Sequence, residues 1–160
     1  MMPAPGRLSR RRALRRIFGT LAWASLVIPT GLAAADLPVI RLSVGKHHLT
    51  VEVAHNESAR ARGLMYRRIL PENRGMLFVF PETALHGMWM MNTYVPLSVA
   101  FLDEEGTIIN IEEMVPLTRT NHAAARPAKY ALEANRGWFA KRGILPGMKL
   151  EGLAAAPFAR

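Results

Sequence analysis

The sequence of 160 residues contains no cysteine. Disulfide bonds, thiolate catalysis and lipid attachment through a leader cysteine are therefore excluded, whichever compartment the protein reaches. The fold has to be stabilised by its hydrophobic core alone. Half of the residues are hydrophobic, and a chain of this length is sufficient for one globular domain but too short for two ordinary ones.

Acidic residues are absent from residues 1–35, which hold six arginines. The remainder of the chain has 15 basic and 12 acidic residues, so its net charge is +3, against +9 for the whole chain. The high sequence pI, near 11, therefore arises from the N-terminal segment. Electrostatic binding of a polyanion needs a dense basic stripe, so we expect no nucleic-acid binding.

Long apolar runs are lacking as well. The run IFGTLAWASLVI, residues 17–28, would be about 18 Å long as a helix, well short of the roughly 30 Å hydrocarbon core of a membrane. It follows the arginine-rich segment and precedes three small residues at 33–35, which is the order of parts in an export signal. We predict that residues 1–35 are a signal peptide cleaved after Ala35, with an uncleaved anchor as the alternative.

The predicted signal also indicates a location. The stretch SRRRALR, residues 9–15, is similar to the twin-arginine export signature, and the general secretory route is the alternative. Either route predicts a periplasmic or secreted protein that touches the membrane only through an uncleaved signal. Twin-arginine export carries folded proteins, so by that route the chain would fold before it crosses.

Patterns of apolar and polar residues predict a mainly β (α+β) domain at 36–153, followed by a flexible tail at 154–160. One short helix is expected around 59–67, with Asn56 or Ser58 as its N-cap, and one helical turn around 136–143. The architecture expected is a compact single-domain barrel-like fold of about seven short strands and two short helices. The predicted strands are 39–44, 48–53, 76–80, 97–103, 107–113, 130–134 and 148–153.

Three long stretches carry a resemblance to a known family. They are RGLMYRRILPENRGMLFVF, WMMNTYVPLSVAFLDEEGTI and YALEANRGWFAKRGILPGMKL. In order and spacing they resemble the bacterial and archaeal domain-of-unknown-function family 192 (DUF192), from about Val39 to Leu153. The resemblance implies a small single-domain β-barrel-like fold, in proteins that are often exported or membrane-tethered. It implies no established activity.

The sequence departs from the family pattern at three positions. Relatives commonly read Phe-Trp-Met-Lys-Asn-Thr, where this chain has Met88 for the phenylalanine and Met91 for the lysine. They also commonly carry an aspartate where this chain has Ser98. The joint loss of a lysine and an aspartate favours a structural ion pair over a catalytic pair, because removing both charges leaves neither one stranded.

The methionine-rich stretch at 86–91 offers one candidate metal site. If it forms a strand, His86, Met88 and Met90 share a face, and thioether and imidazole groups suit Cu(I). Methionine is also an adaptable core filler, and we favour packing over copper handling. The five histidines show no zinc-ligand spacing, so we predict no metal and no cofactor.

Polar residues around this stretch suggest a binding site. Asn92 and Thr93 either bind a ligand or tie down their own turn, and Trp89 is either core or a stacking platform. Glu133 interrupts the apolar run YALEA. Its carboxylate is either on an exposed strand face or partly buried beside Arg62 or Arg136.

We therefore predict a monomeric, non-catalytic envelope module that binds a small ligand, either a glycan, a peptide or an anion. The predicted binding residues are Arg62, Trp89, Asn92, Thr93 and Glu133. Two alternatives remain open. One is an envelope hydrolase that uses Glu133 and Asp103 as paired carboxylates, although Asp103 also suits a turn. The other is Cu(I) handling by His86, Met88 and Met90.

Overall fold

The computed structural model describes Met1 and residues 37–160, so the predicted signal peptide at 1–35 lies outside the described residues apart from Met1. The described residues from 37 onward belong to one compact unit. The elements are β1 (Val39–Val44), β2 (His47–Ala54), α1 (Glu57–Arg62), β3 (Arg74–Ala84), β4 (Gly87–Met88), β5 (Leu97–Leu102), β6 (Ile108–Met114), β7 (His122–Ala123), β8 (Ala128–Asn135) and the 3-10 turns η1 (Ala140–Arg142) and η2 (Leu153–Ala155).

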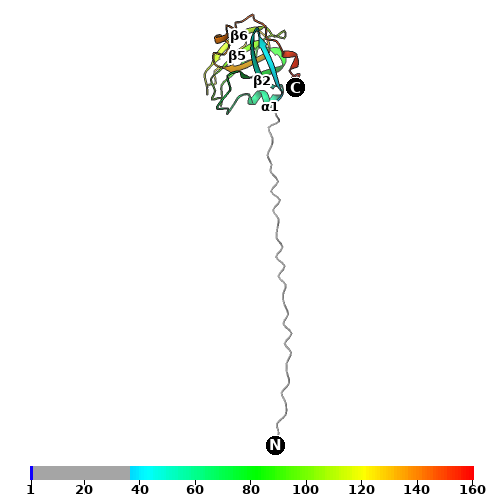
Figure 1. Cartoon of the computed structure of the whole chain (residues 1–160), viewed down its shortest axis with the longest axis vertical. Coiled ribbons are helices and arrows are strands. Elements are labelled where there is room, and N and C mark those ends of the chain that lie inside the picture. Colours follow the sequence, from blue (N-terminus) through cyan, green and yellow to red (C-terminus); the bar gives the residue numbers. More distant parts are fainter. Residues whose placement is uncertain (2–36) are drawn as a thin grey trace. The chain divides into compact units, whose positions relative to one another are not determined.

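Local sequence signals position the first elements. Gly45, in the turn between β1 and β2, has a φ of 56°, which glycine adopts without a steric penalty. Helix α1 begins after Asn56, whose side-chain oxygen accepts a 2.8 Å hydrogen bond from the backbone N–H of Ala59. The hairpin and this cap are confirmed. The helix lies beside β2 and ends at Arg62, earlier than predicted (Figure 1).

Six of the strands form one mixed sheet in the order β1-β2-β3-β8-β5-β6, and β4 pairs with β7 in a small second sheet. All neighbouring pairs of the large sheet are antiparallel except β2 and β3, which are parallel. Parallel neighbours need a crossover, and the segment containing α1 supplies it. The mainly β class is confirmed, but the sheet is not closed into a barrel, so the barrel-like architecture is not confirmed.

The C-terminal segment contacts both edges of the large sheet. Ser43 of β1 and Glu151 exchange backbone hydrogen bonds of 3.1 and 2.8 Å. At the start of β6, the backbone N–H of Ile108 donates a 2.9 Å hydrogen bond to the carbonyl of Met148. The prediction of a regular strand at 148–153 is therefore wrong. The segment forms only isolated bridges, one to Ser43 of β1 and one to Thr107 just before β6.

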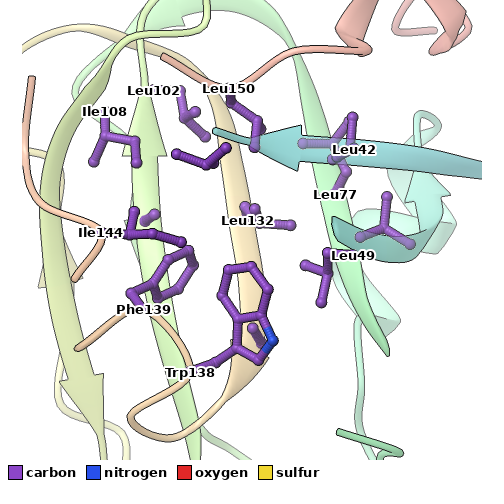
Figure 2. Packing of buried hydrophobic residues seen from close by; sticks show 14 of the residues in the cluster. Leu42, Leu49, Leu77, Leu102, Ile108, Leu132, Trp138, Phe139, Ile144 and Leu150 are labelled. Atoms are coloured by element: carbon purple, nitrogen blue, oxygen red, sulfur yellow. The ribbon is translucent and has the colours of Figure 1, made fainter. Parts of the chain in front are cut away.

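The sheet separates two hydrophobic clusters. Residues of β3 alternate between them, with Leu77 and Val79 on one side and Phe78 and Phe80 on the other. Figure 2 shows the first cluster, in which leucines of the sheet pack against side chains from the C-terminal segment. The labelled residues are Leu42, Leu49, Leu77, Leu102, Ile108, Leu132, Trp138, Phe139, Ile144 and Leu150. The continuous apolar character of β3 thus reflects burial on both faces.

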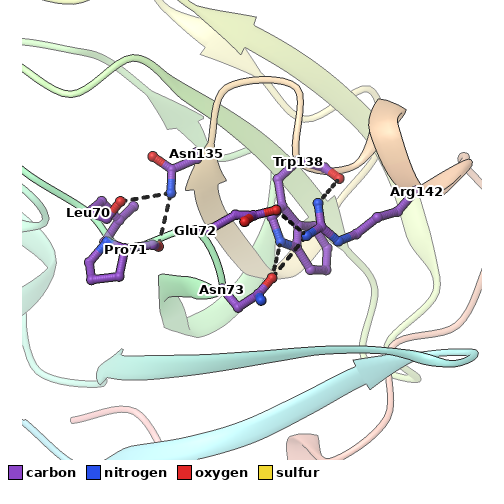
Figure 3. Close-up of polar contacts among 7 residues, drawn as sticks. All are labelled: Leu70, Pro71, Glu72, Asn73, Asn135, Trp138 and Arg142. Atoms are coloured by element: carbon purple, nitrogen blue, oxygen red, sulfur yellow. Dashed lines mark hydrogen bonds and ion pairs between the residues drawn. The ribbon is translucent and has the colours of Figure 1, made fainter.

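A polar network fixes the chain just after β8 (Figure 3). The Asn135 amide donates 3.0 Å hydrogen bonds to the carbonyls of Leu70 and Pro71. The Trp138 indole donates a 3.1 Å bond to Asn73 Oδ1, and Arg142 lies over the same indole with its guanidinium carbon 4.5 Å from the ring centroid. These contacts tie the end of β8 to the loop before β3.

The segment 154–160 makes ordered contacts in the structure. Its last residue, Arg160, donates a 2.8 Å backbone hydrogen bond to the carbonyl of His55, and Ala156 and Ala159 pack against the first hydrophobic cluster. The flexibility predicted for this tail stays a prediction about its behaviour in solution. Within residues 37–160, no helix has the length and apolar character needed to span a bilayer.

Candidate functional site

Glu133 is a buried carboxylic acid in the middle of the large sheet. It lies in β8 with Met76 of β3 opposite on one side and Val99 of β5 opposite on the other. Only 3% of the residue is exposed. Because Ala131 on the same face of β8 belongs to the second hydrophobic cluster, Glu133 projects from a wall that is otherwise apolar.

The surroundings of Glu133 disfavour its ionised form. Burial raises the pKa of its carboxyl from 4.5 to about 8. No hydrogen bond or ion pair joins this side chain to another residue of 37–160, although all fully enclosed side-chain nitrogen and oxygen atoms of that part have partners. The carboxyl oxygens therefore still reach a space that solvent or a ligand can enter.

That space is a cavity of about 300 Å³ on the second-cluster face of the sheet. Its volume is at the lower end of the range for small-molecule sites. The wall is mainly apolar, with the carboxyl of Glu133 as its deeply buried ionisable group. The lining residues are Glu57, Arg60, Ala61, Arg62, Gly63, Leu64, Met65, Phe78, Phe80, Gly87, Met88, Trp89, Thr93 and Glu133.

Helix α1 contributes the other charged groups of the cavity. Glu57 and Arg62 are exposed, whereas Arg60 is partly buried and donates a 3.2 Å hydrogen bond to the carbonyl of Val79. The guanidinium of Arg60 is thus engaged with the backbone of β3. Neither Arg60 nor Arg62 counteracts the effect of burial on the pKa of Glu133.

Trp89 and Thr93 line the cavity, but Asn92 does not. The indole-bearing residue Trp89 is 53% exposed, and Thr93 is buried. The Thr93 hydroxyl donates a 3.3 Å bond to the carbonyl of Met91 in its own turn. The Asn92 amide instead points to Met65, with a nitrogen–sulfur distance of 4.0 Å.

Three loops around Trp89 and Thr93 hold non-glycine residues in the left-handed backbone region. These residues are Tyr66, Asn92 and Leu117, with φ values of 64°, 58° and 61°. Each such conformation costs on the order of 1 kcal/mol or more. The Tyr66 N–H bonds to the Asn92 carbonyl at 2.8 Å, and the Leu117 N–H to the Thr93 carbonyl at 3.2 Å. The loops therefore brace one another and fix the side of the cavity that carries Trp89.

Four of the five predicted binding residues thus line one cavity: Arg62, Trp89, Thr93 and Glu133. Their role in binding stays a prediction. Two expectations about Glu133 are wrong, because its side chain is neither exposed nor in an ion pair with Arg62 or Arg136 within 4.0 Å. Arg136 instead lies 3.3 Å from a carboxylate oxygen of Glu113.

The structure does not bring Asp103 to Glu133. Val99 is the β5 residue opposite Glu133, and Asp103 is four residues further along, a span of about 13 Å in a strand. Glycosidase carboxyl pairs are separated by about 5 to 9.5 Å. Asp103 instead accepts a 2.7 Å hydrogen bond from the backbone of Thr107 and shapes the turn before β6.

Two of the candidate copper ligands, His86 and Met90, are engaged in packing contacts. The strand at this stretch covers only Gly87–Met88, so the expected common face of His86, Met88 and Met90 does not form. Met90 is fully buried in the second cluster, and the His86 ring stacks on Phe80 at a centroid distance of 3.7 Å. In the described part of the chain, no group of three His, Cys, Asp or Glu residues could hold a metal ion.

Ser98, which replaces the aspartate common in the family, has a structural role. Its hydroxyl donates a 2.7 Å hydrogen bond to Glu113 and accepts a 2.8 Å bond from the backbone N–H of Gly137. Ser98 is buried in β5 on the side of the first cluster, and it does not line the cavity. The position therefore connects β5, β6 and the loop after β8, consistent with the structural interpretation of the lost charge pair.

A second hollow, of about 390 Å³, is lined mainly by residues of the hairpin formed by β1 and β2. It is polar and basic, and its residues include Arg41, Lys46, His47, His48 and Arg142. Arg142 is already engaged with Glu72, 2.9 Å away. None of the predicted binding residues lies there, and Arg41, Lys46 and His48 are exposed, so the Glu133 cavity is the stronger candidate.

Sequence reasoning missed most of the cavity wall. Phe78 and Phe80 were recognised only as part of a buried strand, and Arg60 and Met65 only as part of a short helix. The apolar run of β3 was visible in the sequence, but the pairing of β3 with β8 joins segments far apart in the chain. Without that register, nothing in the sequence links these side chains to Glu133.

Comparison with known proteins identifies relatives of the whole domain. No curated protein matches the chain. A crystal structure of a candidate transcription regulator from Sinorhizobium meliloti is 43% identical over 71% of this chain and 92% of its own, with a TM-score of 0.67. A crystal structure of a protein of unknown function from Novosphingobium aromaticivorans is 33% identical over 83% of this chain and 99% of its own, with a TM-score of 0.70.

A protein-family match covers the domain almost from end to end. Residues 40–152 match DUF192, described as Uncharacterized ACR. This range contains β1 from its second residue, β2 to β8, the cavity and the bridges made by the C-terminal segment. The resemblance predicted from the three sequence stretches is confirmed, and the chain belongs to the DUF192 family.

Proposed function

We propose that the protein is an exported, non-catalytic module of the cell envelope that binds a small ligand in the Glu133 cavity. The observation that carries this proposal is a carboxyl group that is 3% exposed, lacks a partner among the described side chains and opens into a cavity of about 300 Å³. Folding gains nothing from burying an acid in this way. A ligand that supplies the missing partner gives the arrangement a purpose.

The lining favours a compact ligand with an apolar body. Phe78, Phe80 and Trp89 offer aromatic surface, and Leu64 and Met65 add aliphatic and thioether groups. A glycan would need several fixed polar partners, and such groups are sparse in this wall. The sequence left open a glycan, a peptide or an anion. In place of these classes, we propose a small molecule that buries apolar surface and directs one polar group to Glu133.

The export part of the proposal rests on the leader sequence. Residues 1–35 combine an arginine-rich segment, a short apolar run and small residues at the expected cleavage point. We propose a periplasmic or secreted monomer. The description of the Sinorhizobium meliloti relative as a candidate transcription regulator applies to that protein, and the mild net charge of +3 outside residues 1–35 gives no support for DNA binding here.

Co-purification tests the binding function. The full chain is expressed with its leader, recovered from the periplasm or medium, and examined by native mass spectrometry for a bound small molecule. We expect an added mass on the wild type that is lost in Trp89→Ala, because this substitution opens one wall of the cavity. Tyr94→Ala is the matched control, since Tyr94 is an exposed aromatic nearby that does not line the cavity.

Two outcomes would contradict the proposal. One is a wild type that carries no added mass and gains none when incubated with envelope extract. The other is equal retention of a ligand by Trp89→Ala and the wild type. N-terminal sequencing of the recovered protein tests the export part separately, and we expect a mature chain that begins at Asp36.

A further inference from the structure

The chemistry around Glu133 specifies the ligand further. The groups that face this carboxyl from β3 and β5 are apolar, with Met76 and Val99 directly opposite. The ionisable groups of the cavity wall besides Glu133 are Glu57, Arg60 and Arg62, all on α1. No cation of the described chain lies within 4.0 Å of the Glu133 carboxyl.

A positively charged ligand group would complete this site. An ammonium beside a desolvated carboxylate gains a strong interaction, because the low local dielectric screens the attraction between the two charges only weakly. The aromatic rings of Phe78, Phe80 and Trp89 add favourable surface for a cation. An anionic group at the same depth would repel the ionised carboxylate, and with the protonated acid it could form a hydrogen bond but no ion pair.

We propose that the cavity binds a primary ammonium group carried on a compact apolar body, with the ammonium against the Glu133 carboxylate and the body against Phe78, Phe80 and Trp89. This inference rests on the proposed binding function and names the ligand class. The guanidinium of Arg60 keeps its charge, but it is directed to the Val79 carbonyl and lies more than 4.0 Å from the Glu133 carboxyl. Arg62, being exposed at the mouth, suits a polar or anionic outer end of the ligand.

Binding of such a ligand changes the protonation of the site. Burial raises the pKa of Glu133 to about 8, so the free protein holds this proton at neutral pH. An alkylammonium is also protonated there. Formation of the carboxylate–ammonium pair therefore releases one proton to solvent for each ligand bound. A neutral ligand that hydrogen-bonds to the protonated acid releases none.

Three probes of similar shape test the inference by isothermal titration calorimetry at neutral pH. They are benzylamine, benzyl alcohol and benzoate, each measured in phosphate and in HEPES, two buffers that lack a primary amine and differ in ionisation enthalpy. We expect benzylamine to bind most tightly, by roughly tenfold or more, as for a hydrogen bond between charged groups. We also expect a buffer-dependent enthalpy that corresponds to release of close to one proton.

Two variants separate this effect from general binding. Glu133→Gln should weaken benzylamine by roughly tenfold or more and abolish proton release, while benzyl alcohol changes little. Glu82→Gln is the matched control, because Glu82 is an exposed acid of β3 that does not line the cavity. It should leave proton release unchanged.

The inference is overturned by equal affinity for benzylamine and benzyl alcohol, by unchanged benzylamine binding in Glu133→Gln, or by benzylamine binding weaker than a Kd of about 10 mM. The proposed function is judged by a different result, the retention of a co-purified ligand in the wild type and its loss in Trp89→Ala. A ligand without an amine in that experiment would refute the ammonium inference and leave the binding function in place.

Discussion

At the scale of single residues, Glu133 affects folding and binding in opposite ways. An ionised carboxylate without a partner is unfavourable in a buried apolar wall, and the folded protein responds by keeping the acid protonated. The same isolation leaves a strong interaction available to a ligand. Glu133 therefore destabilises the free protein at high pH. We expect it to stabilise the complex when a ligand fills the cavity.

The pH dependence of stability follows from this shift. The pKa of Glu133 is 4.5 unfolded and about 8 folded, so between these values the folded state holds a proton that the unfolded state has released. The contribution of this proton to stability is fully present below pH 4.5. The free energy of unfolding then falls by roughly 1.4 kcal/mol per pH unit as the pH rises towards the pKa of the folded state. Urea denaturation from about pH 5 to about pH 8 measures this slope.

Glu133→Gln should flatten that slope, because the amide does not titrate. Glu52 does not confuse the result. The hydrogen bond from Arg67 lowers the pKa of Glu52, so its contribution is lost only as pH falls below the normal range of a carboxyl. Identical slopes of the free energy of unfolding against pH for the wild type and Glu133→Gln, between about pH 5 and about pH 8, would show that the pKa of Glu133 is not raised in the folded protein.

The sequence identified Glu133 as a candidate but not its environment. The phase of YALEA placed it on the face shared with Ala131, which is correct. Its burial depends on Met76 and Val99, which come from strands far away in the chain. For Asn92 two roles were predicted, ligand binding or local structure. In the structure its side chain contacts Met65 and its backbone carbonyl accepts a hydrogen bond from Tyr66.

At the scale of secondary-structure elements, close approach of β3 to β8 fixes the position of Glu133. Gly75 of β3 pairs with Ala134, and a Cβ atom at Gly75 would clash with the backbone carbonyl oxygen of Glu133. A larger residue would force the two strands apart beside the carboxyl. The glycine therefore holds the sheet side of the cavity in register.

Gly75→Ala is accordingly expected to destabilise the protein by about 1–3 kcal/mol, the usual cost of overpacking. Gly87→Ala is the matched control. Its new Cβ would meet the side chain of the exposed Asn121, which can move away, so the expected change is within about 0.5 kcal/mol. Urea denaturation of both variants provides the comparison, and an equal loss of stability in the two would contradict this account of β3 and β8.

Local patterns were sufficient to locate most elements. Alternation predicted β1 and β2, and the asparagine N-cap predicted the start of α1. The two short strands β4 and β7 were missed, because two residues carry no period, and their pairing is fixed only by tertiary contacts. The parallel pairing of β2 with β3 was missed for a related reason, since adjacent predicted strands are compatible with several sheet orders.

At the scale of the whole molecule, the C-terminal segment compensates for the open sheet. Edge strands β1 and β6 would otherwise expose unpaired backbone groups. The segment around Met148 and Glu151 bonds to both edges, and Leu150 is buried in the first cluster. The number of predicted strands does not indicate this arrangement. The C-terminal segment bonds to the two edges through irregular backbone instead of a continuous strand.

Truncation tests the role of this segment. Removing residues 147–160 should destabilise the domain by about 3 kcal/mol or more, because it removes buried Leu150 together with the hydrogen bonds to both edges. Removing only residues 157–160 deletes the bond from Arg160 to His55 and should cost about 1 kcal/mol. Equal stability of the two truncated proteins, measured by urea denaturation, would show that the bridges do not support the sheet.

The most direct measurement concerns the proton on Glu133 itself. The carboxyl carbon of Glu133 can be followed by NMR as a function of pH in the wild type, with Glu133→Gln used to assign its signal. We predict a midpoint near pH 8 in the free protein and a clear downward shift of that midpoint when benzylamine is added. A midpoint close to 4.5 in the free protein, the ordinary value for this group, would contradict the account.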